Sequence, residues 1–343
     1  MGPDSLMLAM PAEKPALALA PEPDLVSRIL AEARRRGATH VHVDPVGEAM
    51  QVRLRIAGQL TELLRVPEWL DLCLEEHGVE VARFGARLVI HLPPPAARSG
   101  ELEALGMTAT LVCTLAPILA LGSGLILVAG PSGSGRSTTL RTLMRQLDDG
   151  TRNLLSADTV AQLREALRQD ADAILIDTIR DKDTARLAVQ AVEAGHLVLA
   201  GVDANDSVGA IQHMRTLRLE PFQLASSLRA VLAQRLVRHL CRECRRPVQA
   251  QGSVSALLGF DPGTVVYAPV GCERCDGGFS GRIAVFEAIH ADAPLRRLIN
   301  DGGDGSIIAR HAFLNAPNLG SSARAMVREG LTTPDEAVRV SRG

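Results

Sequence analysis

A glycine-rich segment near the middle of the chain has the spacing of a phosphate-binding loop. Residues 130–137 read Gly-Pro-Ser-Gly-Ser-Gly-Arg-Ser, which fits G-x-x-x-x-G-K-[ST] except that arginine stands in the lysine position. Glycines let backbone N–H groups surround phosphate oxygens, and a helix that starts in the loop adds positive potential. We therefore predict nucleotide contacts. The contact residues would be Gly130, Ser132, Gly133, Ser134, Gly135, Arg136, Ser137 and Thr138.

Two positions in this loop decide how well it can work. The Ser137 hydroxyl would be a ligand of Mg²⁺ that accompanies ATP. Arg136 keeps the positive charge, but its wide planar guanidinium does not fill the place of a compact ammonium, so we expect weakened nucleotide binding. The alternative is a strand-to-helix turn that binds no ligand.

Four cysteines form a second candidate site. Cys241-x-x-Cys244 and Cys272-x-x-Cys275 are separated by the 27 residues 245–271. Two such pairs are typical of a tetrahedral Cys₄ zinc site, and in a reducing compartment this outranks a pair of disulfides. Four protein ligands leave no open position on the metal, so we predict structural Zn²⁺. Cys73 and Cys113 lie in apolar surroundings and are expected to be buried.

The composition excludes some classes of function. Of 343 residues, 46% are hydrophobic and 22% charged, which is ordinary for globular domains. The formal net charge of -2 argues against a protein that wraps nucleic acid, and the 2% of aromatic residues argue against one that stacks single-stranded bases. We therefore expect no nucleic-acid partner.

We expect neither a signal peptide nor a transmembrane helix. Residues 1–23 lack a basic n-region and contain several prolines, which predicts a disordered leader. No charged residue occurs between Glu103 and Arg136, but glycines and Pro117 interrupt this run. We interpret it as a buried helix over 108–121 and a buried strand over 125–129. The chain is expected to be cytoplasmic.

The remaining elements must position these sites. Helical spacing predicts a helix over 24–36, and alternating residues predict strands over 41–43 and 52–56 with Arg53 and Arg55 facing outward. Strands then alternate with helices, which indicates a mostly parallel sheet. These elements are helix 136–147, strand 153–156, helix 160–169, strand 173–177, helix 182–194, strand 196–202 and helices 207–217 and 222–239, before a helical tail.

In these motifs the chain resembles the hexameric ATPases of type II secretion and type IV pilus assembly. The similar segments keep the same order along the chain. They are 36–45, 52–58, 130–139, 167–172, 174–181, 195–199, 220–228, 232–237, 281–287 and 330–336, together with the cysteine pairs. The resemblance implies a RecA-like P-loop fold of class α/β and an ATPase ancestry.

The same comparison shows a degenerate catalytic site. Thr178 stands where the family has the glutamate that orients water, and threonine cannot serve as a general base near neutral pH. Asp203 stands in the position of the family's histidine. The family's acidic box is reduced to residues 153–158, and a hairpin after it is missing. Asp177 would hold Mg²⁺ with Ser137, or alternatively cap the following helix.

The resemblance also assigns a role outside the loop. Arg53 and Arg55 match positions from which the family reaches nucleotide phosphates, although the plain alternative is a solvated strand face. The expected domains are a leader 1–23, a small αβ domain 24–100, a RecA-like P-loop domain 101–239, a zinc subdomain 240–290 and a helical region 291–343.

Three hypotheses for the function follow. The first is an ATP-binding subunit of a secretion or pilus system with weak or no hydrolysis of ATP to ADP and phosphate. The second is a working ATPase, and the third is a zinc-stabilised docking subunit that needs no nucleotide. Expected partners are copies of the chain or an active paralogue in a hexamer, and an inner-membrane platform protein, with peripheral association at that membrane.

Overall fold

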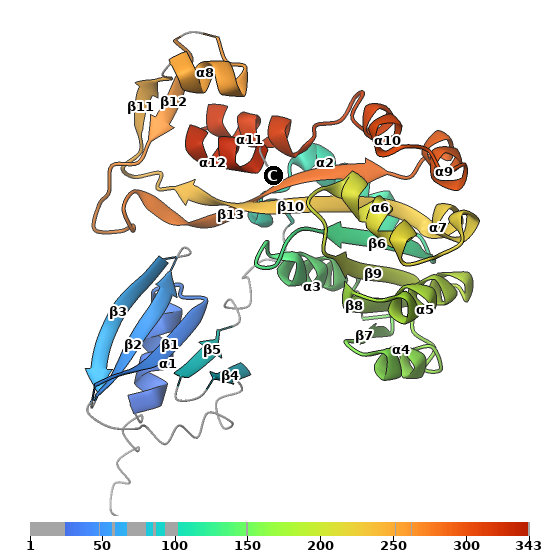
Figure 1. Cartoon of the computed structure of the whole chain (residues 1–343), viewed down its shortest axis with the longest axis horizontal. Helices are drawn as coiled ribbons and strands as arrows, with labels where there is room; N and C mark the ends of the chain where they lie inside the picture. The colour runs from blue at the N-terminus through green and yellow to red at the C-terminus, as the bar shows by residue number, and fades with distance from the viewer. Residues whose placement is uncertain are drawn as a thin grey trace, which may run out of the picture. The chain divides into compact units, whose positions relative to one another are not determined.

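The structure, a computed structural model, describes residues 25–47, 49–56, 59–66, 80–84, 87–92, 102–148, 150–250, 252–261 and 263–341. They fall into two compact units divided between Pro94 and Pro95, which we describe separately (Figure 1). The leader over 1–23 and Cys73 lie outside the described residues.

The first unit is an antiparallel sheet with one helix. Its strands have the order β3-β2-β1-β5-β4. The elements are α1 (Leu25–Arg35), β1 (His40–Val46), β2 (Ala49–Ile56), β3 (Gln59–Val66), β4 (Glu80–Phe84) and β5 (Arg87–His91). The predicted helix and the first two strands are confirmed, whereas β3, β4 and β5 were not predicted.

Alternation along β1 and β2 separates two faces of this sheet. Val41, Val43, Val52 and Leu54 are buried in one cluster with the apolar face of α1. Because side chains alternate along a strand, the residues between them lie on the other face. His42 on β1 lies opposite Arg53 on β2.

The second unit is built on a six-stranded sheet of order β13-β10-β6-β9-β8-β7. Five strands run parallel and β13 runs antiparallel to β10. The strands are β6 (Gly124–Ala129), β7 (Leu154–Ser156), β8 (Ala173–Ile179), β9 (Leu197–Val202), β10 (Leu228–Leu240) and β13 (Phe279–His290). This arrangement confirms the predicted α/β fold class.

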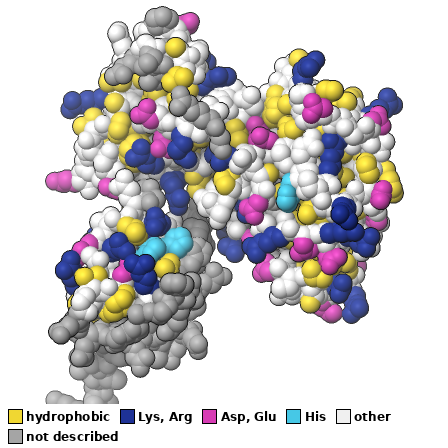
Figure 2. All heavy atoms as spheres, in the orientation of Figure 1, with side chains coloured by type: hydrophobic (Ala, Val, Ile, Leu, Met, Phe, Trp, Pro, Cys, Tyr) yellow, Lys and Arg dark blue, Asp and Glu magenta, His cyan; other side chains and the backbone are white. Residues whose placement is uncertain are grey.

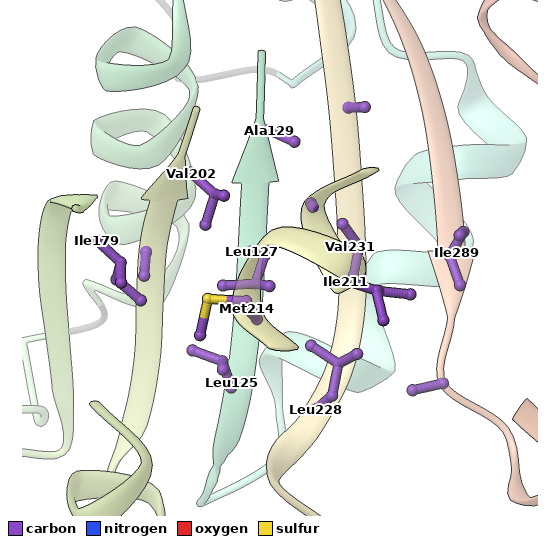
Figure 3. Packing of buried hydrophobic residues seen from close by; sticks show 14 of the residues in the cluster. Leu125, Leu127, Ala129, Ile179, Val202, Ile211, Met214, Leu228, Val231 and Ile289 are labelled. Atoms are coloured by element: carbon purple, nitrogen blue, oxygen red, sulfur yellow. The ribbon is translucent and has the colours of Figure 1, made fainter. Parts of the chain in front are cut away.

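Helices cover both faces of this sheet. On one face lie η2 (Leu102–Leu105), α2 (Ala109–Leu119) and α3 (Arg136–Leu147), which pack on the side of β6 that carries Ile126 and Val128. On the other lie α4 (Val160–Ala166), α5 (Lys182–Glu193), α6 (Ser207–Thr216) and α7 (Pro221–Ser227). Figure 3 shows Leu125 and Leu127 of β6 directed toward Met214 of α6.

The predicted helix over 222–239 is wrong. The chain forms the short α7 and then enters β10, which pairs with β6 on one side and β13 on the other. A central strand buried on both faces lacks the polar alternation that marks a strand, so its apolar run cannot be told from a buried helix by periodicity. Hydrogen bonding to β6 and β13 makes this segment a strand and not a helix.

The C-terminal part adds a hairpin and helices. The hairpin consists of β11 (Arg246–Gln249) and β12 (Val265–Ala268), joined through α8 (Gly252–Leu258). The predicted helical tail is present as α9 (Ala293–Asn300), α10 (Gly305–Ala312), α11 (Leu319–Arg328) and α12 (Pro334–Ser341). Since β13 belongs to the central sheet, that sheet extends across the boundary expected at 239/240.

The uncharged stretch 104–135 forms α2 and β6, as predicted. Across the described residues, no helix combines the length and hydrophobicity needed to cross a membrane. The helix α2 is buried on one face only, through Leu115, Ile118 and Leu119. Cys113 is exposed, so the expectation that it is buried is wrong.

Candidate nucleotide site and metal centre

The phosphate-type loop connects a fully buried strand to a helix. All residues of β6 are buried, and α3 begins directly after Gly135. Gly135 is the N-cap of α3 and has φ of 90°, in the left-handed region that favours glycine. This geometry presents the helix N-terminus at the carboxyl edge of the parallel sheet, where ligands bind in open α/β sheets.

Arg136 lies at the start of α3, with its side chain held against the chain itself. Its Nη1 donates to the carbonyl oxygens of Gly130 and, at 2.8 Å, Val202, and it forms an ion pair with Asp203. The side chain of Arg136 is 12% exposed and that of Asp203 is 55% exposed. Sequence reasoning singled out both residues but missed that they are paired.

The two residues predicted to hold Mg²⁺ are in contact. The Ser137 hydroxyl donates to Oδ1 of Asp177 at 2.6 Å. Thr178 donates its hydroxyl to the other carboxylate oxygen at 3.4 Å, so it faces the same group. A hydroxyl and a carboxylate so close together are oxygen ligands of the kind that Mg²⁺ prefers.

The alternative interpretation of Asp177 as a helix cap is wrong. The N-cap of α5 is Asp181, whose carboxylate accepts the backbone N–H of Thr184 at 2.8 Å. That hydrogen bond lowers the pKa of Asp181. Asp177 is therefore not needed as a helix cap, and its carboxylate contacts Ser137 of the phosphate loop.

Close packing of β8 against β9 fixes the position of Asp177. Regular pairing is interrupted between Ile176 and Ile179. A Cβ at Gly201 would lie 2.0 Å from the carbonyl oxygen of Asp177, which only glycine permits. The strand end that carries Asp177 and the one that carries Asp203 are therefore held side by side.

Gln234 is a loop-binding residue that sequence reasoning missed. It lies on β10, is 1% exposed, and its side-chain amide donates to the carbonyl oxygen of Ser134 at 2.8 Å. The signal in the sequence that could have identified it is one amide side chain at the end of the apolar run 230–234. A buried polar side chain in such a run normally has a specific partner.

Arg53 and Arg55 belong to the first unit, so their distance from the loop is not defined. Arg53 donates to Asp44 at 2.5 Å, and Arg87 pairs with the other oxygen of that carboxylate at 3.0 Å. Figure 2 shows histidine and basic side chains gathered on this unit. Burial lowers the pKa of His42, and the positive charge of Arg55 adds to the shift. The phosphate contacts of Arg53 and Arg55 stay a prediction.

The four predicted cysteine ligands come together. Cys241 follows directly after β10, and the sulfur atoms of Cys241, Cys244, Cys272 and Cys275 all lie within 4.8 Å of one another. The Sγ–Sγ distances are 3.9 Å from Cys241 to Cys272 and 3.7 Å from Cys244 to Cys275. Tetrahedral zinc with Zn–S bonds near 2.3 Å requires edges of about 3.8 Å. The donor set therefore fits a zinc ion.

The thiol of Cys272 donates to the sulfur of Cys275, so the two titrate as a pair in which the pKa of Cys275 is lowered and that of Cys272 is raised. Burial acts to raise the pKa of Cys275, but the backbone N–H and the thiol of Cys272 act against it. The result is a pKa lowered to about 7. A thiolate is the species that coordinates zinc.

Comparison with known proteins gives a consistent result. The sequence model of the family described as Type II/IV secretion system protein matches residues 80–161 and 156–339. Type II secretion system protein E of Pseudomonas aeruginosa is 33% identical, over 93% of this chain and 75% of that protein. Type II secretion system ATPase E of Vibrio cholerae is 31% identical, over 94% of this chain and 76% of that protein.

Solved structures share the fold. The ATPase DotB of Legionella pneumophila superposes with a TM-score of 0.66 at 14% identity, over 94% of this chain and 98% of that chain. The pilus retraction motor PilT, solved with bound ADP, gives a TM-score of 0.63 at 19% identity with the same coverage. At these identities the likeness concerns the fold.

Proposed function

Because the chain belongs to the type II/IV secretion system protein family, we propose that it is an ATP-binding subunit of a type II secretion or type IV pilus assembly system whose hydrolysis is strongly reduced or lost. The observation that carries this proposal is the ion pair between Arg136 and Asp203. In this pair the positive charge of the loop, on Arg136, is bound by the carboxylate of Asp203, a group of the same chain.

The loss of hydrolysis rests on this ion pair and on one further feature, the residue at position 178. Thr178 stands at the position of the family's glutamate and donates its hydroxyl to Asp177, so it offers no base for the attacking water. Removing general-base assistance typically lowers the rate by about 10²–10⁴. A misplaced cation adds to this loss, because catalysis of phosphoryl transfer depends on positioning and on charge at the γ-phosphate.

Binding of nucleotide is supported by the loop itself. The buried strand, the left-handed Gly135 and the N-terminus of α3 are all present. Backbone N–H groups at a helix N-terminus bind phosphate without a lysine. Mg²⁺, which would neutralise phosphate charge, would be held by Ser137 and Asp177.

A working ATPase remains the second candidate, and one observation favours it. The carboxylate of Asp177 lies 2.6 Å from the Ser137 hydroxyl. A carboxylate beside the loop serine holds the metal in many P-loop enzymes. A metal held there would stabilise charge at the γ-phosphate even without a base at position 178.

The partners follow the family. We propose assembly with further copies of the chain, or with an active paralogue, into a hexamer on the cytoplasmic side of an inner-membrane platform protein. Zn²⁺ held by Cys241, Cys244, Cys272 and Cys275 would stabilise the end of β10, since the first cysteine directly follows that strand. The zinc would supply folding energy and no chemistry.

Calorimetric titration with Mg-ATP tests the binding part of this proposal. We expect saturable binding weaker than micromolar in the unaltered chain and none in Gly135→Val, whose side chain would crowd Gln234. Sub-micromolar affinity would contradict a weakened site. Titration curves that are the same for both proteins would favour the docking subunit that needs no nucleotide.

A further inference from the structure

The guanidinium of Arg136, which is largely but not fully buried, has an anionic partner from its own chain. Its Nη1 contacts the carbonyl oxygens of Gly130 and Val202 and the carboxylate of Asp203. In the described part of the chain, Asp203 is the one acidic group paired with Arg136. We propose that Asp203 is a built-in anion that takes the place of a nucleotide phosphate at Arg136, so that the phosphate loop binds its own chain. This inference rests on the proposed function.

Burial gives this contact its weight. Only 12% of the Arg136 side chain is exposed, so its charge requires acceptors inside the protein. The two carbonyl oxygens supply partial charges, and Asp203 supplies the full negative charge. A hydrogen bond between charged groups is roughly twice as strong as one between neutral groups.

The contact also joins the phosphate loop to the end of β9. Gly130 begins the loop, whereas Val202 is the last residue of β9 and Asp203 follows it. The backbone N–H of Gly130 donates to the Val202 carbonyl at 3.3 Å, so the guanidinium extends an existing connection between the two segments. The loop is therefore held to β9 without any ligand.

A competition follows by linkage. If Asp203 holds Arg136, then phosphate must displace or share that partner, and the free energy of the ion pair opposes binding. Asp203 thus acts as a positioning residue that lowers nucleotide affinity. Its removal should release Arg136 toward phosphate.

A double-mutant cycle separates this mechanism from simple repulsion between Asp203 and phosphate. The readout is the dissociation constant for Mg-ATP by calorimetry. The variants are Asp203→Asn, Arg136→Gln and the double variant. Arg136→Gln keeps donors for the two carbonyl oxygens. Asp183→Asn, which removes an exposed negative charge at the start of α5, is the charge-matched control.

We expect Asp203→Asn to bind at least about threefold more tightly, since a partly exposed ion pair contributes up to about fivefold in an equilibrium constant. In the Arg136→Gln background the same substitution should give no gain, and Asp183→Asn should match the unaltered chain. The midpoint of thermal unfolding without nucleotide should fall in Asp203→Asn, which shows that the contact stabilises the ligand-free loop.

Two results would overturn this inference. One is an affinity of Asp203→Asn equal to that of the unaltered chain. The other is a gain that persists in the Arg136→Gln background, which is the signature of repulsion alone. Both results leave the proposed function standing, since in each of them the unaltered chain binds Mg-ATP.

Two other results bear on the proposed function as well. Absence of Mg-ATP binding in every variant would overturn the proposed function and this inference together. Binding that is seen only in Asp203→Asn would support the inference and contradict the proposed function.

Discussion

The guanidinium of Arg136 and the carboxylate of Asp203 form an ion pair across 67 residues of sequence. The resemblance to the secretion ATPases implies a different residue at each position, lysine in the loop and histidine after the strand. Two departures that look independent in the sequence are one interaction in the structure. Under the proposed function, this pairing is what a site adapted to a state without tightly bound nucleotide would contain.

Replacing Arg136 by lysine should tighten the binding of Mg-ATP. A compact ammonium can reach between the β- and γ-phosphates, which the planar guanidinium held by Gly130 and Val202 does not. We expect a dissociation constant lower by about threefold or more, comparable to one exposed ion pair. Calorimetry measures it, with Arg141→Lys at an exposed position of α3 as control. Unchanged affinity would show that Arg136 is not the limiting defect.

Replacing Gln234 by leucine should destabilise the loop. The carbonyl oxygen of Ser134 would lose its buried donor, and an unsatisfied buried group lowers the free energy of unfolding by about 1–3 kcal/mol. Mg-ATP binding should weaken as well, since the loop carries the predicted phosphate contacts. Denaturant unfolding measures the first effect, and Gln190→Leu at an exposed position of α5 is the control. Equal stability of the two variants would rule out this anchoring role.

Purified protein should contain one zinc ion per chain, held by the four cysteines. Cys241→Ser should lower the metal content and reduce the melting temperature by more than about 4 °C, because a structural site contributes directly to folding. Cys113→Ser, at an exposed cysteine outside the cluster, should leave both unchanged. Elemental analysis and thermal unfolding provide the data. Well under one equivalent of zinc, with oxidised thiols, would contradict the assignment.

The buried carboxylate of Glu336 should make stability depend on pH. Burial acts to raise its pKa, but hydrogen bonds from Arg339 and Arg238 outweigh this, so the pKa lies below the ordinary value of 4.5. The carboxylate therefore stabilises the fold above pH 4.5, and this contribution is lost as the pH falls through the lower folded pKa.

Unfolding of Glu336→Gln over a range of pH tests this sign. The difference in free energy of unfolding from the unaltered chain should be largest above about pH 5 and shrink below the ordinary pKa. Glu165→Gln, at an exposed carboxylate on α4, should show a small difference throughout. A difference for Glu336→Gln that grows as the pH falls would refute the proposed sign.

The parts of the fold that sequence predicts well are those set by local signals. The segment from Gly124 through Leu147 combines an uncharged run, punctuating glycines and a helical pattern, and its strand and helix are confirmed. β10 carries no such signal, because it is buried between β6 and β13 and its apolar run has neither period clearly. Only the pairing of strands distant in sequence makes it a strand.

The candidate site divides in the same way. Residue type and spacing predict the cysteine cluster, and the resemblance to P-loop ATPases implies that Ser137 lies near Asp177. The structure brings both groups of residues together. The partnership of Arg136 with Asp203 depends on β6 and β9 being neighbours in the sheet, which no local pattern reveals. The contact of Gln234 with the loop likewise depends on β10 lying beside β6.

The most direct measurement of the central claim is steady-state phosphate release by the purified chain in Mg-ATP, with Gly135→Val as the blank. We predict a rate equal to the blank while calorimetry shows ATP binding to the unaltered chain. Thr178→Glu alone should not recover activity, because Arg136 stays paired with Asp203. A rate clearly above the blank, saturable in ATP and abolished by Gly135→Val, would contradict this account and identify a working motor.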